Sequence, residues 1–474
     1  MKLAFKWPHL LGVIIITSIF YIQSPPTDLS IQGYHLALLF IATIASIVLN
    51  IMPTGAIAIL SIAIYCVILP VESTGKAAIT SELHDFNNTL IWLILIAFMM
   101  ARAFTKTGLG ERISLVLLSK FGQSSLRIAY CLGLADYILA PATPSNTARF
   151  AIISPIANSL AKTINNKDRK LGEFLISNAS AMNDASAVGF STAFAGNLAL
   201  IGIASTLLGI NLTFGSWAMY LLIPSLCLYL IIPFILYLFI SPETKDTPQA
   251  PIFAKEKLKE IGHMSISEIL LTIIFIALVI MWIFGPMLNL DATSAAFIGL
   301  SAMLMLGVLN WDDIKSEKGA WDTLIWFSVL MGMANHLRSL GVVKWLGVNV
   351  SAFLSSTMNG ASPIIFLLVL MLFFLLTSYL FASGTAKIVA LSGVIIGALL
   401  TLGVHPIIAL LSVAGIMNIG CNLTTYSHAR NPLAMGYGYH TPGKWMMNGI
   451  VICGAGYIIF MSTGLIWWKI LGLE

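Results

Sequence analysis

The segment Pro141-Ala142-Thr143-Pro144-Ser145-Asn146-Thr147-Ala148-Arg149 decides the fold of this chain, because part of it occurs twice. Its prolines stop a helix. The hydroxyl and amide side chains after them are typical of the N-terminus of a helix. The pattern recurs in the second half of the chain as Ser383-Gly384-Thr385-Ala386-Lys387. We expect Ser145 or Thr147 to cap a helix whose free N–H groups and partial positive charge favour a bound carboxylate.

The whole chain carries an internal repeat. Two further matches occur in the same order and with nearly the same separation along the chain: Thr89–Trp92 with Thr323–Trp326, and Ala195, Asn197 and Gly202 with Ala429, Asn431 and Gly436. Secondary transporters are often built from inverted repeats whose interrupted segments meet near the membrane midplane and form the substrate site. A channel or a membrane enzyme can also be duplicated, but here the repeated polar motifs are themselves the interrupted segments.

Composition excludes a soluble enzyme. Of the 474 residues, 58% are hydrophobic and 9% are charged, whereas soluble domains carry about 25% charged residues. The apolar residues form blocks of about 15 to 25, long enough for membrane-spanning helices, and they lack the alternation of membrane strands. The net charge of +5 gathers in a few loops, which indicates membrane orientation and membrane lipid as a partner rather than nucleic acid.

Clear spanning candidates alternate with less regular apolar stretches. The candidates are residues 10–22, 35–51, 56–69, 89–104, 216–240, 266–288, 294–309, 363–380 and 448–468. Residues 126–160, 172–212 and 383–437 are interrupted by Pro, Gly, Asn, Ser and Thr. Irregular backbone survives at membrane depth only where protein or a water-filled cavity covers it, so these stretches predict a buried site.

Two basic loops set the orientation. Residues 162–170 and 245–259 belong on the cytoplasmic side, and one outward and one returning helix would join them. Residues 1–22 resemble a signal peptide but offer no cleavage site, so we expect a retained first span with a cytoplasmic N-terminus in a bacterial-type inner membrane. The polar segment 241–262 is interpreted as the linker between two halves.

Arg149 and Lys387 occupy the same place in the two repeats, four residues after Ser145 and Ser383. A charge at that depth is costly unless it has a function or a partner. Two fixed cations could compensate the charge of a bound dianion. The alternative is a structural ion pair with Asp136 or Asp184.

Other polar residues in the interrupted segments could close the same pocket or could simply join helices. They are Thr192, Asn197, Thr424, Thr425, His428, Arg430 and Asn431. His428 and Arg430 lack counterparts in the first repeat, so they could tune substrate choice. The five cysteines lie in apolar stretches and predict no disulfide framework. Metal-ligand spacing, a phosphate loop and a nucleophile elbow are lacking, so no catalytic residue, metal or other cofactor is expected.

The motifs 144–149, 381–387, 423–426 and 436–439 resemble the divalent anion:sodium symporter (DASS) family over almost the full length. The most similar branch is that of the citrate/succinate and 2-oxoglutarate/malate translocators. The resemblance implies an all-α polytopic homodimer with about eleven spans and two re-entrant hairpins, one per repeat. It also implies an elevator mechanism, in which a transport domain slides against a scaffold.

Applied to this chain, the resemblance places the scaffold at about 1–120 and 262–355. The transport domain would comprise about 121–261 and 356–474. The residues at the hairpin tips would bind substrate carboxylates: Ser145, Asn146, Thr147, Ser383, Gly384 and Thr385.

This sequence departs from the sodium-coupled members in two ways. Gly384 replaces the second Asn of the motif, and a cation follows each motif where coupled members have small or neutral residues. We therefore predict sodium-independent exchange of small carboxylates of the malate, succinate, 2-oxoglutarate and citrate class. The alternatives are a sodium-coupled dicarboxylate or sulfate symporter, for which sodium would be the cofactor, an anion channel, and a membrane enzyme.

Overall fold

The computed structural model describes residues 6–68, 79–80, 82–358 and 360–473. This part of the chain is helical and contains no strand. Within it, six helices are long and apolar enough to cross a membrane: α2 (Ile31–Val48), α5 (Thr89–Thr107), α11 (Phe214–Ile240), α13 (Ile266–Phe284) with its 3-10 extension to Leu288, α19 (Gly384–Thr401) and α22 (Pro442–Ile470). Shorter apolar helices are α1 (Trp7–Tyr21), α3 (Thr54–Ile68), α10 (Ala195–Leu208), α14 (Ala292–Met305), α18 (Pro363–Leu376) and α20 (Pro406–Ile419).

All nine predicted spans coincide with helices, although Leu69, at the end of the third, lies outside the described residues. The stretches expected to be irregular are mostly helical. In and next to these stretches, irregular backbone and short 3-10 turns interrupt the helices at residues 140–145, 190–194, 377–383 and 420–430, and connections between helices lie at 209–212 and 402–405. Helix-breaking residues elsewhere are tolerated, as Pro155 lies inside α8 (Asn146–Asn165).

The first repeat contains a re-entrant hairpin made of α7 (Ser125–Leu139) and α8. The start of α7 is bonded to the segment after α11, because the Ser125 amide donates to the Lys245 carbonyl at 2.9 Å. The end of α8 meets the same segment, because the Asn165 side-chain amide donates to Thr244 Oγ1 at 3.2 Å. Both ends of the hairpin therefore lie on one side, which confirms that the two basic loops share a side.

The second hairpin, α18 and α19, opens toward the opposite side. Gly403, just after α19, packs against Pro363 at the start of α18, so both ends lie together. From there α20, a break and α21 (Asn431–Gly436) run across to Gly438, whose carbonyl accepts a bond from Arg169 beside the first hairpin. The two repeats are thus inverted.

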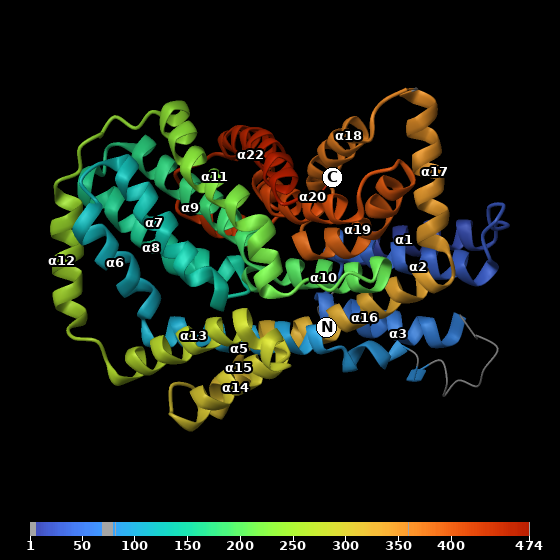
Figure 1. Cartoon of the computed structure of the whole chain (residues 1–474), viewed down its shortest axis with the longest axis horizontal. Helices are drawn as coiled ribbons and strands as arrows, with labels where there is room; N and C mark the ends of the chain where they lie inside the picture. The colour runs from blue at the N-terminus through green and yellow to red at the C-terminus, as the bar shows by residue number, and fades with distance from the viewer. Residues whose placement is uncertain (1–5, 69–78, 81, 359, 474) are drawn as a thin grey trace.

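Each hairpin is preceded by a connecting helix. Helix α6 (Leu109–Phe121) leads into the first hairpin and α17 (Val342–Thr357) into the second, after α15 (Trp311–Ser316) and α16 (Lys318–Ser339). Helix α12 (Gln249–Ile261) lies along the outside beside α6 (Figure 1). Arg112 of α6 pairs with Glu268 of α13, Nε to Oε1 at 2.6 Å, and fixes α6 to the second repeat.

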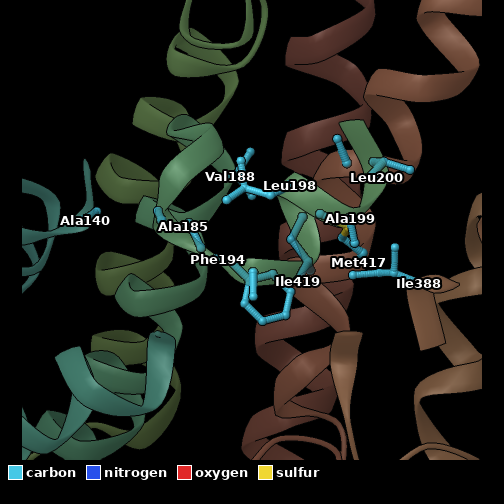
Figure 2. Packing of buried hydrophobic residues seen from close by; sticks show 14 of the residues in the cluster. Ala140, Ala185, Val188, Phe194, Leu198, Ala199, Leu200, Ile388, Met417 and Ile419 are labelled. Atoms are coloured by element: carbon cyan, nitrogen blue, oxygen red, sulfur yellow. The ribbon is translucent and has the colours of Figure 1, made fainter. Parts of the chain in front are cut away.

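Helix α10 lies at the centre of the molecule and joins the repeats. It follows α9 (Arg169–Gly189) after a break, as α21 follows α20. Ala199 of α10 lies beside Met417 of α20 with Ile388 of α19 close by, and Leu198 of α10 points toward Val188 of α9 (Figure 2). The buried core therefore positions both interrupted helices and both hairpin tips around one region.

Candidate anion-binding site

The two hairpin tips share one local structure. Ser145 caps α8 by accepting a bond from the Ala148 amide at 3.2 Å, and Ser383 caps α19 in the same way at 3.4 Å. The first intrahelical bonds come from the amides of Arg149 and Lys387. Two N–H groups at each helix start therefore have no helical partner and remain available to an anion. They belong to Asn146 and Thr147 in the first tip and to Gly384 and Thr385 in the second. The prediction of a capped helix start is confirmed for Ser145.

The first tip is bonded to the break between α9 and α10. The Ala195 amide donates to the Pro144 carbonyl at 3.0 Å, and the Thr192 hydroxyl donates to the Pro141 carbonyl at 2.5 Å. From the same break, the Phe194 ring lies against the second tip, where a methyl group added to Gly384 would be 3.3 Å from it. One aromatic side chain thus lies between the two motifs.

Only part of each tip is open. Ser145, Thr147 and Ser383 are half-buried, as is Thr425 in the break before α21. The other predicted tip residues, Asn146, Gly384 and Thr385, are buried. The Asn146 side-chain nitrogen is buried without a hydrogen-bond partner among the described residues. A buried donor left unpaired is costly, so this amide is suited to a bound acceptor.

Arg149 forms the ion pair of the structural alternative. It is fully buried, and its Nε lies 3.2 Å from Asp136 Oδ2. Its Nη1 donates to the carbonyls of Thr143 in the tip and Ala193 in the break, at 2.5 and 2.6 Å. Arg149 therefore holds the first tip against the interrupted helix.

Lys387 is buried in the equivalent place without a carboxylate among its partners in the described chain. Its Nζ donates to Ser378 Oγ at 2.7 Å and to the Phe374 carbonyl at 3.1 Å, and it lies 4.3 Å from the Phe374 ring centre. Phe374 precedes Lys387 by the same interval as Asp136 precedes Arg149, so the two are equivalent positions of the repeat. An aromatic ring thus replaces the counter-ion in the second repeat.

Arg430 has its own carboxylate. It lies 2.6 Å from Asp184 and donates to Asn183 Oδ1 at 2.8 Å. The Asn183 amide in turn donates to Asp136 at 2.9 Å, which links the two ion pairs. The sequence interpretation missed Asn183, although polar residues recur at helical spacing along this part of α9, at Ser177, Ser180, Asn183 and Asp184.

The described centre therefore carries a surplus of positive charge. Arg149 and Arg430 are matched by Asp136 and Asp184, while Lys387 is not matched. In a buried environment an uncompensated cation attracts an anion far more strongly than in water. No cluster of metal-binding side chains occurs among the described residues. The site is suited to binding an anion.

Comparison with known proteins identifies the family. The family model described as the sodium:sulfate symporter transmembrane region matches residues 4–473 of this chain. The chain belongs to the DASS family.

Two DASS relatives are similar to this chain in sequence over nearly its whole length, and one solved structure is similar to it in fold. The Bacillus subtilis protein named "Putative malate transporter YflS" is 39% identical over 99% of this chain and 98% of its own. "Dicarboxylate transporter 2, chloroplastic" of Spinacia oleracea is 35% identical over 98% and 82%. The structure of the Alcanivorax borkumensis YdaH transporter has a TM-score of 0.58 at 14% identity, over 92% and 99%. The protein is a membrane-spanning transporter, not an enzyme.

The repeated asparagines of this DASS chain close the two breaks. Asn197 donates to the carbonyls of Ala187 and Phe190, and Asn431 donates to those of Cys421 and Thr424. Each accepting carbonyl precedes its asparagine by the same interval in both repeats. The repeat thus extends to individual hydrogen bonds, which hold both interruptions in shape.

The remaining predicted pocket residues are engaged inside the second break. The Thr424 hydroxyl accepts from the Ser427 amide at 2.8 Å, and His428 Nδ1 accepts from the Arg430 amide at 3.2 Å. The His428 ring lies 6.0 Å from that of Phe194, between centres. A direct contact of either residue with substrate stays a prediction.

Proposed function

We propose that the protein exchanges di- or tricarboxylate anions across the inner membrane without sodium. The observation that carries this proposal is Lys387, a buried cation beside the second hairpin tip whose counter-ion position holds Phe374. Relatives named malate and dicarboxylate transporters support the substrate class. Malate, succinate, 2-oxoglutarate and citrate all carry at least two carboxylates, one of which would pair with this cation.

We assign substrate binding to the two tips. The free amides and hydroxyls of Ser145, Asn146 and Thr147 would hold one carboxylate, and those of Ser383, Gly384 and Thr385 the other. Lys387 would compensate the charge directly. Arg149 would act mainly by holding the first tip, given its bonds to Thr143 and Ala193.

Exchange follows from the surplus charge. The empty site would move through the membrane with an unpaired buried cation, at a high cost. In the loaded site one carboxylate would pair with Lys387 and the tip amides would bind the other, so that the loaded site keeps one net negative charge with both carboxylates bonded. The carrier would therefore return only with an anion bound. In sodium-coupled relatives the metal ion would supply this charge, and here Lys387 would supply it.

An elevator movement fits the division of the chain that we propose. The scaffold would comprise residues 1–120 and 262–355, and the transport domain residues 121–261 and 356–474, in a homodimer with cytoplasmic N-termini. Bonds from the first tip to the α9–α10 break, and from Tyr426 to the Tyr379 carbonyl at 2.9 Å in the second repeat, support movement of hairpins and interrupted helices as one body.

The test is labelled succinate uptake into proteoliposomes. Vesicles loaded with succinate should take up label rapidly with or without sodium, and empty vesicles should take up little. Sodium-dependent uptake into empty vesicles would overturn the proposal and favour the sodium-coupled symporter. Fast uptake without internal substrate or sodium would favour a channel.

A further inference from the structure

A large cavity lies beside the second hairpin, and Phe381, two residues before the cap Ser383, forms part of its lining. It has a volume of about 510 Å³ and is enclosed by α2, α10, α16, α17, α18 and α19, within the range of about 300–1,000 Å³ typical of ligand pockets. Its lining is almost entirely apolar and includes Phe40, Ile44, Leu346 and Ala390. We call it the α17 groove.

The α17 groove opens onto an exposed apolar surface. Ile41 and Phe373 line it and are 61% and 56% exposed. Ile364, in the first turn of α18, and Leu380, just after that helix, are 57% and 65% exposed. On helices that cross a membrane, such exposed apolar side chains contact acyl chains, so an occupant of this groove enters from the bilayer.

A cation lies at the rim of the groove. Arg338, in the last turn of α16, lines the cavity and is exposed. Its guanidinium has no ion-pair or hydrogen-bond partner among the described residues. Asn335, one turn earlier, is already engaged, since its amide donates to Asp85 at 2.9 Å. A free guanidinium beside an apolar groove suits a phosphate whose acyl chain fills the groove.

In the first repeat, helix α12 covers the position that corresponds to the α17 groove. There a cavity of about 270 Å³ lies among α5, α6 and α8, the counterparts of α16, α17 and α19, and Phe253 and Lys257 of α12 complete its lining. In the second repeat, no described helix that lines the groove corresponds to α12. The larger cavity is thus in the second repeat, which has no helix equivalent to α12 among the described helices that line it.

We propose that the α17 groove binds one anionic phospholipid from the bilayer, with an acyl chain between α2 and α19 and the phosphate on Arg338. Because α2 and α16 belong to the proposed scaffold and α18 and α19 to the second hairpin, this lipid would touch both sides of the surface that slides. It would link membrane composition to transport.

The test counts bound lipid and does not depend on transport. Purified protein in mild detergent is mixed with phosphatidylglycerol or phosphatidylcholine of equal chain length and analysed by native mass spectrometry. The unmodified chain should retain one phosphatidylglycerol in preference to phosphatidylcholine. Arg338→Gln, at an exposed position, should reduce retention at least fivefold, and Ala390→Phe should do so by filling the groove.

Two matched variants separate the groove from general effects. Arg127→Gln removes another exposed arginine, and Ala56→Phe enlarges an exposed alanine of α3; neither residue lines the groove. Both should bind lipid like the unmodified chain. Equal phosphatidylglycerol retention by Arg338→Gln and the unmodified chain would overturn the proposal. So would loss of the dimer rather than of lipid in Ala390→Phe, because a second copy would then occupy the groove.

Discussion

Two buried cations at equivalent positions have different surroundings, and this difference divides their roles. Arg149 is bonded to Asp136 and to two carbonyls, whereas Lys387 has a hydroxyl, one carbonyl and an aromatic ring. The sequence located both cations and named Asp136 as a possible partner. It could not tell which cation is neutralised, because that depends on which side chain of the preceding helix reaches the cation in the folded protein: Asp136 in the first repeat and Phe374 in the second.

Lys387→Met should weaken the binding of dianions more than that of monoanions. It removes a cation without leaving a carboxylate unpaired, so the protein should fold and bind dicarboxylates about tenfold more weakly, equivalent to about 1.4 kcal/mol. Competition assays with succinate and a matched monocarboxylate measure the difference. Lys387→Arg, which keeps the charge, is the control, and equal losses for both anions would contradict a charge role.

Arg149→Met should act mainly on stability. It leaves Asp136 buried and unpaired, which typically costs about 3–5 kcal/mol, so the apparent melting temperature should fall. The double variant Arg149→Met with Asp136→Leu should recover much of this loss. If the single variant melts like the unmodified protein and only its dianion affinity falls, the structural role is wrong.

Glu82, outside the spanning helices, should make stability depend on pH. Burial, aided by neighbouring Asp85, raises its pKa from 4.5 to about 7. Between these values the folded state keeps a proton that the unfolded state releases, so stability should fall as pH rises from 4.5 to 7. The effect is at most about 3 kcal/mol. Glu82→Gln should therefore raise the melting temperature more at pH 8 than at pH 5, and the exposed Glu256→Gln should not.

At the scale of elements, hydrophobic runs and repeated polar motifs predicted the spans and the two interruptions. The same patterns overestimated the irregular backbone, since most of residues 172–212 is helical. Side chains compensate for each break locally, as Asn197 and Asn431 do, and such compensation is invisible in composition. Asn183 was missed for a related reason: its importance comes from contacts with both repeats, which no single segment reveals.

The caps of α8 and α19 should matter for both stability and binding. Ser145→Ala and Ser383→Ala should each cost about 1 kcal/mol, as lost N-caps do, and should raise the KM for succinate because the free amides lose their alignment. Ser124 caps α7 at the far end of the first hairpin, so Ser124→Ala should cost similar stability with an unchanged KM. An unchanged KM in all three variants would show that the hairpin tips do not bind succinate.

At the scale of the molecule, inverted hairpins surround a shared central helix, α10, and the proposed motion between the two domains would take place at the contacts of α10 with the scaffold. Gly202 of α10 faces Met331 of α16, since a methyl group added to Gly202 would be 2.7 Å from Met331 Cε. This contact crosses the proposed boundary between transport domain and scaffold. It therefore offers a direct test of whether the two parts slide.

Cross-linking Gly202→Cys with Met331→Cys should arrest exchange. In a background lacking the half-buried Cys66 and Cys227, mercuric ion should abolish most uptake, and dithiothreitol should restore it. The control pair is Gly189→Cys with Ser225→Cys within the proposed transport domain, since a methyl group added to Gly189 would be 3.3 Å from Ser225 Cβ. Exchange that continues at full rate through the Gly202–Met331 cross-link would rule out an elevator.

The replacement of a carboxylate by Phe374 beside Lys387 also has an electrical consequence. A site with one surplus positive charge that carries a dianion moves as a single negative charge, and moving one charge through 100 mV involves about 2.3 kcal/mol. Exchange of one dianion for another returns that charge and is electroneutral. Exchange of a dianion for a monoanion would instead move net charge and respond to membrane voltage, so the electrical polarity of the cell would itself select which carboxylates leave and which enter.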